Sequence, residues 1–231
     1  MSELTNKRLV KKLQPSLTLL FSSSVKKWLW PTVFILPFAL WHFTSDVLTY
    51  VRYGAPVGQI WYVFSKLFGL YAVLLLWYLA VSTLLKNTTY ANALPQWTFL
   101  HHRVLGSVTL LAVVIHIACF VIAVSLRKQT IAWSLLLPDF KDFYHTAITV
   151  GLFGFFIALI AMAAALMRRR FPMVWQTIHR AMVLVVFLGL VHGYLIGTET
   201  RYGLYEIFYC ALILILLLAI VLRWRLQKEQ R

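Results

Sequence analysis

The residues best suited to chemistry in this sequence are four histidines arranged as two pairs with nearly equal spacing. Thirteen residues separate His102 from His116, and twelve separate His179 from His192. At ~1.5 Å of rise per residue, the members of each pair lie ~20 Å apart along a helix. A b-type haem with two axial histidines needs one imidazole on each side of its iron. Two matched pairs therefore predict two haems, stacked at two levels.

The sequence around these histidines is that of a membrane protein. Of its 231 residues, 61% are hydrophobic and 13% are charged, whereas a soluble domain carries about 25% charged residues. Apolar runs near the ~20 residues that cross a bilayer cover 28–47, 58–85, 99–126, 144–167, 172–196 and 204–222. We therefore expect an all-α integral membrane protein, a six-transmembrane-helix haem-binding bundle, with a first span kinked by Pro31 and Pro37.

Basic residues predict the orientation of the bundle. If the N-terminus is cytoplasmic, 16 of the 22 lysines and arginines fall on the cytoplasmic side. The opposite side keeps Arg52, Lys66, Arg127, Lys128, Lys141 and Arg201. Because positively charged loops stay in the cytoplasm, both termini are expected there. The third and fifth spans then run in the same direction. His102 comes level with His179 near the cytoplasmic side, and His116 with His192 in the outer half.

The same basic loops account for the net charge of +15, so no nucleic-acid binding is expected. The expected organisation is a cytoplasmic basic segment, 1–27, a transmembrane domain, 28–222, and a cytoplasmic tail, 223–231. Within the first segment, residues 7–21 form either an amphipathic helix on the membrane surface or a disordered tail. Cys119 and Cys210 lie in apolar runs without a CxxCH motif, which excludes a covalent c-type haem.

Small and basic residues accompany the histidines. Arg103 and Arg180 directly follow His102 and His179, the two histidines near the cytoplasmic side. There they either pair with haem propionates or anchor a helix at the membrane face. The nearby glycines suit either a macrocycle close to the backbone or close helix packing; they are Gly106, Gly189, Gly193 and Gly197.

The spacing in the fifth span raises a geometric problem. At ~100° per residue, His116 returns to within ~40° of the face of His102, but His192 falls ~140° from His179. We expect the fifth helix to be overwound or bent, or the two haems to sit at different azimuths.

These residues resemble the ferric-reductase-like transmembrane domain superfamily, which includes ferric reductases, the NADPH oxidases and the bacterial MsrQ/YedZ haem proteins. The two histidine spacings match the haem-ligand pattern of the oxidases and ferric reductases. The flanking segments are more similar to MsrQ: Arg-Val-Leu-Gly at 103–106 and Trp-x-x-x-His-Arg at 175–180. The resemblance covers about residues 58–197. MsrQ-type proteins usually carry arginine where this chain has His102. The presence of all four histidine ligands in this chain therefore favours two haems.

The resemblance implies transmembrane electron transfer in a bacterial inner membrane. A donor would reduce the haem between His102 and His179: a flavin such as FMN or FAD, a separate flavin reductase, or quinol. The haem between His116 and His192 would pass the electron to an outer acceptor: a ferric chelate, a periplasmic redox partner or oxygen. Arg168, Arg169 and Arg170 either hold a flavin phosphate or only signal topology. With no nicotinamide-binding motif, the chain is expected to be an oxidoreductase component without its own flavin and nicotinamide domain.

Two other functional classes stay open. The chain is either a haem-binding anchor or relay subunit of a larger redox complex, or a transporter whose histidines line a proton or metal path. A transporter would scatter ionisable residues over several spans. Three histidines lie outside the paired pattern. His101 is a substitute for its neighbour, one position out of register, while His42 and His145 either flank an outer acceptor site, carry protons or are structural.

Overall fold

The computed structural model describes residues 23–86, 88, 101–197, 200 and 203–229. The regular elements of this described part are all helices, so the expected all-α fold is confirmed. The α-helices are α2 Ser23–Thr44, α3 Val47–Tyr53, α4 Gln59–Leu85, α6 His102–Lys128, α7 Phe143–Leu166, α8 Pro172–Arg180, α9 Met182–Ile196 and α10 Gly203–Glu229, with a 3₁₀ turn, η2, at Trp133–Leu136. The possible amphipathic helix at 7–21 lies outside the described residues.

Five helices are long and apolar enough to cross a membrane: α4, α6, α7, α8 together with α9, and α10. A sixth span exists if α2 and α3 form one bent crossing. Large apolar side chains are exposed on the outer faces of these helices, among them Leu111, Phe187 and Ile207. Exposed apolar faces of this kind are suited to contact with lipid. Lipid hydrocarbon offers no hydrogen bonds, and the backbone groups of a helix need none from it because they bond to one another.

The first span differs in detail from the single kinked helix expected over 28–47. Pro31 and Pro37 lie inside α2. A bend of 46° separates the segment Pro31–Thr44 from Val47–Tyr53. At this break Asp46 adopts a left-handed backbone conformation, with φ +49°, which ends one helix before the next begins.

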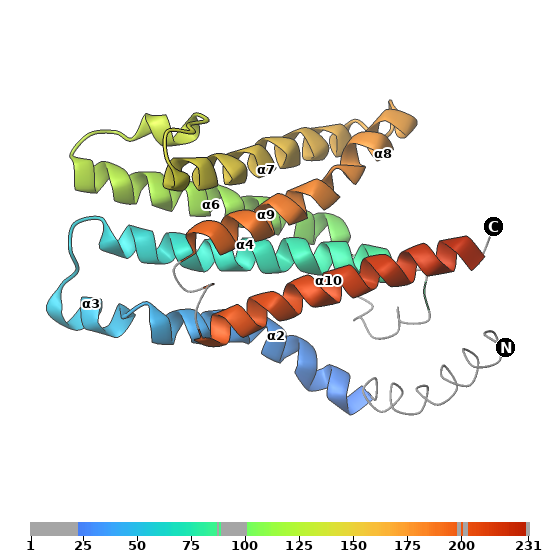
Figure 1. Ribbon diagram of the computed structural model, residues 1–231, viewed down its shortest axis with the longest axis horizontal. Coiled ribbons are helices and arrows are strands. Elements are labelled where there is room, and N and C mark those ends of the chain that lie inside the picture. Colours follow the sequence, from blue (N-terminus) through green and yellow to red (C-terminus); the bar gives the residue numbers. More distant parts are fainter. Residues whose placement is uncertain (1–22, 87, 89–100, 198–199, 201–202, 230–231) are drawn as a thin grey trace.

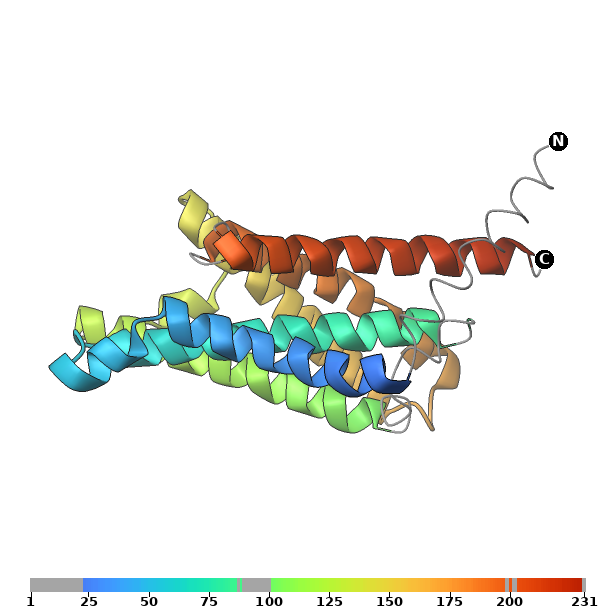
Figure 2. The ribbon, with the colours of Figure 1, turned by 90° about the horizontal axis from the view of Figure 1, so that it is seen from below.

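The helices alternate in direction along the long axis of the molecule (Figure 1). The described start of α2 and the end of α10 lie at the same end, and α6 runs in the same direction as α9. Seen from below, α10 lies along one side of the bundle and α2 lies beside α4 (Figure 2). Because α8 precedes α9 in the same span, the parallel course brings His102 of α6 and His179 of α8 to the same end, as expected from the sequence.

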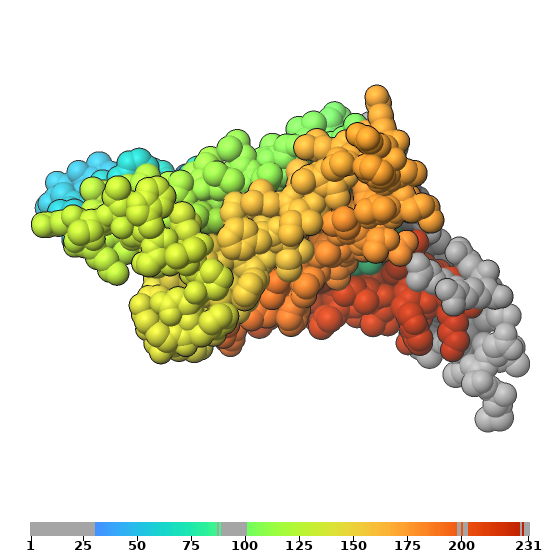
Figure 3. Space-filling view, turned by 90° about the horizontal axis from the view of Figure 1, so that it is seen from above, coloured from blue at the N-terminus to red at the C-terminus, as the bar shows by residue number. Residues whose placement is uncertain are grey.

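Helix α4 is the centre of the bundle. It packs against α6, α9, α10 and α2, and every residue from 72 to 79 is buried. The second packed unit is α7 with α8 and α9. In the space-filling view, α6, α7 and α8 make up one face of the molecule (Figure 3). The histidine-bearing helices are thus each supported from behind by a neighbour, α6 by α4 and α9 by α7.

Aromatic side chains tie the peripheral helices to this core through backbone carbonyls. A buried indole N–H or phenol O–H must find an acceptor, because no water is available in the hydrocarbon. The bonds are Trp41 Nε1 to Val63 O (2.8 Å), Trp77 Nε1 to Leu212 O (2.7 Å), Tyr205 Oη to Pro37 O (3.1 Å) and Tyr209 Oη to Leu190 O (2.8 Å). They fix the rotation of α2 and α10 relative to α4 and α9.

Helix α4 begins at a close approach to α6. Gly58 precedes α4 with φ +76°, and a Cβ at this position would collide with the carbonyl oxygen of Ala123 on α6. Gly54 also has a positive φ, +82°, but a Cβ there would meet nothing within 4 Å. Gly54 therefore meets only a conformational requirement, a positive φ, whereas Gly58 also meets a packing requirement, the close approach of α6.

We expect Gly58→Ala to lower the thermal stability of the detergent-solubilised protein more than Gly54→Ala. Both variants place a β-carbon at a positive φ, which costs about 1–2 kcal/mol. Only the first also pushes against a backbone carbonyl, which can move only if α6 moves. Midpoint temperatures of unfolding, measured in the same detergent, check this. Equal losses for the two variants would show that the contact between α4 and α6 does not constrain position 58.

Candidate functional site

The structure brings the four histidines together as two facing pairs at two levels. The rings of His102 on α6 and His179 on α8 have centroids 6.4 Å apart, with planes inclined at 77°. The rings of His116 on α6 and His192 on α9 have centroids 6.3 Å apart, with planes inclined at 79°. Both pairings are those expected from the sequence. We call the first the inner pair and the second the outer pair.

The ring separations match the separation of two imidazoles on opposite sides of one metal ion. A ring nitrogen lies about 1.2 Å from the centroid and about 2.0 Å from a bound metal, so two imidazoles on opposite sides of one ion have centroids about 6.4 Å apart. The observed values of 6.4 and 6.3 Å agree with this spacing. Edge-to-face aromatic contact alone also falls in this range, so the hydrogen bonds of the rings are needed to distinguish the two.

In the outer pair, Nδ1 of each ring is already hydrogen-bonded to a helix backbone. His116 Nδ1 lies 2.7 Å from the carbonyl oxygen of Ser65 on α4, and His192 Nδ1 lies 2.8 Å from that of Ala147 on α7. A carbonyl oxygen only accepts, so each Nδ1 carries the hydrogen and donates it. The other ring nitrogen, Nε2, then keeps its lone pair in the neutral imidazole. This is the arrangement that metal-binding histidines usually adopt.

Two glycines that the sequence reasoning did not select make room for these rings. A Cβ on Gly69 of α4 would come within 2.9 Å of His116 Nδ1, and one on Gly151 of α7 within 2.6 Å of His192 Nδ1. Both distances are too short for non-bonded atoms, so only glycine fits without a shift of the ring. A search for glycine four residues after a small residue, Ser65 or Ala147, would have found both positions.

The fifth span is broken between its two histidines. Helix α8 ends at Arg180, α9 begins at Met182, and Ala181 lies between them. The Ala181 N–H donates to the carbonyl of Ile178, three residues earlier, at 3.0 Å. Such a 3₁₀-type bond turns the chain by ~120° per residue instead of ~100°. The structure thus has a break with one overwound turn between the two histidines, and this turn supplies part of the ~140° that regular helix geometry leaves between them.

In the inner pair, His179 lacks the backbone acceptor that each outer histidine has. His179 Nδ1 is buried, and no hydrogen-bond partner for it is found among the described residues. The indole of Trp175, one turn earlier on α8, lies against the His179 ring, with centroids 5.5 Å apart. The His179 ring is therefore oriented by an aromatic neighbour and not by a backbone acceptor.

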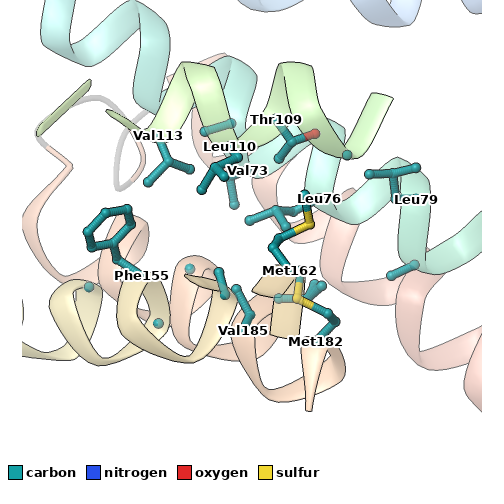
Figure 4. A pocket seen from close by; sticks show the side chains of 18 of the residues that line it. Val73, Leu76, Leu79, Thr109, Leu110, Val113, Phe155, Met162, Met182 and Val185 are labelled. Atoms are coloured by element: carbon teal, nitrogen blue, oxygen red, sulfur yellow. The ribbon is translucent and has the colours of Figure 1, made fainter. Parts of the chain in front are cut away.

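A cavity of about 1440 Å³ connects the two levels, and all four histidines line it. Pockets for single small ligands occupy roughly 300–1000 Å³, so this space suits a larger ligand or more than one. Between the levels its wall is nearly all apolar, with Val73, Val113, Phe155, Met162 and Met182 pointing into it from four helices (Figure 4). The Thr109 hydroxyl in this wall donates to the carbonyl of Leu105, so it adds little polarity.

Positive charge gathers at the ends of this cavity. The described residues that line it include no aspartate or glutamate, and its lysines and arginines are Lys66, Lys86, Arg103, Arg168, Arg169 and Arg180. All but Lys66 lie toward the ends of helices near the inner pair. Arg103 and Arg180 are thus at the cavity, where they were expected from the sequence. A ligand that is apolar in the middle and anionic at an edge would match this wall.

The glycines chosen from the sequence divide into two groups. All four line the cavity. Gly106 has open space around it, and a Cβ at Gly189 would make only ordinary contacts, with Val73 at 3.8 Å and Leu76 at 3.9 Å. Gly193 and Gly197 also allow close packing, because a Cβ would collide with Tyr209 of α10 at the first and with Thr200 at the second. For these two, the helix-packing interpretation is the one that the contacts favour.

The three remaining histidines do not line the cavity. His101 is the exposed residue before α6. His42 stacks on Phe38, with ring centroids 6.3 Å apart. His145 lies 2.8 Å from the Asp142 carboxylate, and its backbone N–H donates to the same group. Each has a local structural contact or a surface position.

Comparisons with protein-family models, with curated proteins and with solved structures gave no match to this chain. The resemblance described above therefore depends on the residues and their spacing.

The Asp142 carboxylate caps α7 and its titration should be visible in the stability of the protein. The backbone N–H of His145 and then its side chain hold the pKa of Asp142 below its ordinary value. A carboxyl with a lowered pKa stabilises the fold fully above its unfolded-state pKa of about 3.9, and this stabilisation disappears as the pH falls through the lower folded value.

We expect Asp142→Ala to lower the midpoint temperature of unfolding at pH 7, with a difference from the parent that shrinks below about pH 4. Asp142→Asn keeps an N-cap acceptor without a titrating group, so it should lose less stability than Asp142→Ala at pH 7, and its difference from the parent should also shrink as the parent carboxylate becomes protonated. Thermal unfolding of the three proteins as a function of pH makes the comparison. A loss in Asp142→Ala that stays constant to pH 3 would contradict the role of the ionised carboxylate.

Proposed function

We propose that this protein is a transmembrane electron carrier that holds two b-type haems, one between His102 and His179 and one between His116 and His192. The observation that supports it most is the pair of facing imidazoles at each of two levels of one cavity, with ring separations that match those of two imidazoles on one metal ion. Bound haem supplies reversible one-electron exchange between ferric and ferrous iron. The chain supplies axial ligands, orientation and an apolar space.

The number of ligands favours a porphyrin over a bare metal ion. Each level offers two imidazoles, and no group of three or more histidine, cysteine, aspartate or glutamate side chains suited to a metal ion is found among the described residues. Structural zinc takes four protein ligands and catalytic zinc takes three. A haem iron brings four equatorial nitrogens of its own and needs only the two axial positions filled.

The cavity wall favours the same ligand. A haem is a broad apolar ring with two carboxylates on one edge, and the wall is apolar between the levels and cationic at its ends. Arg103 and Arg180, beside the inner histidines, are the residues we assign to the inner haem's propionates. The transporter alternative predicts ionisable residues along a path, whereas here apolar side chains separate the two histidine levels.

The distribution of basic residues gives the direction of transfer that we propose. The inner pair lies at the end where α2 begins and α10 ends, and the positive-inside rule makes this end cytoplasmic. Electrons would enter there from a flavin, a flavin reductase or quinol, and leave near the outer pair to a ferric chelate, a periplasmic redox partner or oxygen. This assignment, a bacterial inner membrane location and membership of the ferric-reductase-like group are parts of the same proposal.

Two haems per chain are expected in purified protein. Two pairs of ligands at separate levels each complete one iron, so a pyridine haemochrome assay calibrated against protein concentration should give a ratio near 2. The reduced-minus-oxidised spectrum should show the bands of six-coordinate b-type haem. A ratio near zero in folded protein would remove the proposal, and a ratio near 1 would restrict it to one level.

Alanine at one level should remove the haem of that level only. His116→Ala and His192→Ala should each lose the outer haem, while His179→Ala should lose the inner one, because each iron takes axial ligands from a single level. His101→Ala is the matched control, since its side chain precedes α6 and lies outside the cavity wall. The measurement is haem content and a redox titration of each variant in membranes. Loss of the same haem in His116→Ala and His179→Ala would contradict the two-level arrangement.

A further inference from the structure

We propose that Gly69 and Gly151 uncover two helix carbonyls that position the outer imidazoles, and that this makes the outer haem the one of lower midpoint potential. The inference rests on the proposed haem function and adds to it a difference between the two levels. It concerns two positioning residues on α4 and α7, neither of which is a ligand.

The first of these carbonyls is on α4. The oxygen of Ser65 accepts from His116 Nδ1 at 2.7 Å, and Gly69 follows four residues later. The Ser65 hydroxyl reinforces the contact, because it donates to the backbone carbonyl of His116 at 3.0 Å. The ring of His116 is therefore held against α4 by its side chain and its main chain.

The second carbonyl is on α7 and repeats the first. The oxygen of Ala147 accepts from His192 Nδ1 at 2.8 Å, and Gly151 follows four residues later. Two helices that are distant in sequence thus present the same combination of acceptor and glycine. The ligands they serve face each other across one gap of 6.3 Å.

The spacing of four has a physical reason. In an α-helix the carbonyl of residue i points toward residue i+4 and accepts its N–H, while the oxygen keeps a second lone pair. The β-carbon of residue i+4 stands beside this oxygen and limits the approach of a second donor. With glycine at i+4, an imidazole can reach the lone pair. A β-carbon at these two glycines would come within 2.9 and 2.6 Å of the donating nitrogens.

The inner level has no such arrangement at His179. Its Nδ1 is buried without a hydrogen-bond partner among the described residues, and its ring contacts the indole of Trp175. The two levels therefore differ in how the chain holds their ligands.

This difference sets the expected order of midpoint potentials. An imidazole that donates from Nδ1 to a carbonyl is a more basic ligand, and a more basic ligand favours ferric over ferrous iron. The cations near the inner pair, among them Arg103, Arg180 and Lys86, favour the ferrous state, which carries one positive charge less. Both effects place the outer haem below the inner one.

The order can be measured with the ligand variants. In His179→Ala the outer haem is the one expected to remain, and in His192→Ala the inner one. We expect a lower midpoint potential for the haem of His179→Ala than for that of His192→Ala. The two values should match the lower and upper steps in the titration of the unmodified protein. Equal potentials, or the opposite order, would overturn the inference.

The glycines are tested by adding a methyl group. Gly69→Ala and Gly151→Ala should raise the midpoint potential of the outer haem or lower its occupancy, and should leave the inner haem unchanged. Gly154→Ala is the matched control on α7, because a Cβ there meets only the Leu188 Cβ, at 3.4 Å. The readouts are haem content and redox titration, neither of which requires turnover. An outer haem with unchanged occupancy and potential in both variants would overturn the role of the glycines.

Failure of this inference can be distinguished from failure of the haem proposal itself. Folded, unmodified protein without haem would remove the proposed function, whereas two haems in the wrong order would remove only the present inference. A glycine variant that loses both haems has unfolded or moved α6 and α9, which contradicts a local role if Gly154→Ala keeps both. Gel filtration in detergent identifies unfolding, and the order of potentials in the ligand variants then decides the question.

Discussion

The distance between the histidine-bearing helices is the constraint on which the rest of the structure depends. Two imidazoles can share one metal ion only if their helices are held apart, at a ring separation of about 6.4 Å, and apolar helices would otherwise close on each other. Here α6 packs against α4, and α9 packs against α7. The supporting helices are in turn fixed by aromatic hydrogen bonds to carbonyls, such as that of Trp77 to Leu212. The packing of these helices keeps the cavity open.

The chemistry of the cavity follows from the medium around it. In hydrocarbon an unpaired polar group is expensive, so the wall between the two levels is made of side chains such as Val73, Val113 and Phe155. Charge is confined to the ends, where Arg103 and Arg180 lie. Such an apolar wall lowers the polarity around any ligand that it holds. The positive residues at the end near the inner pair suit a ligand with an anionic edge there.

The two levels of the site are not equivalent. The outer rings are tied to the backbones of α4 and α7, whereas His179 has a buried Nδ1 with no acceptor among the described residues. Backbone acceptors cannot be exchanged by a single substitution, so the outer level is the more firmly fixed part of the design. An outer haem of lower potential would keep an electron at the inner level until an acceptor withdraws it from the outer one.

The sequence by itself determined the membrane class, the helical fold and the pairing of the histidines. These follow from apolar runs of bilayer length and from equal spacing on parallel helices, which are local or periodic properties. It did not determine how His179 and His192 reach one face. The break at Ala181, with its 3₁₀-type bond, lies between them, and a count of residues does not reveal it.

Only the tertiary structure decided which small residues serve the site. Gly193 belongs to a series of glycines at every fourth residue and is next to His192 in the sequence, yet the side chain that it packs against is Tyr209 of α10. The spacing of Gly69 and Gly151 from a small residue does not show which side chain they face, and only packing places them against Nδ1 of His116 and His192. Their role exists only between helices, since it needs a carbonyl on one and an imidazole on another. Contacts between segments far apart in the chain are fixed by packing and leave no local periodicity to read.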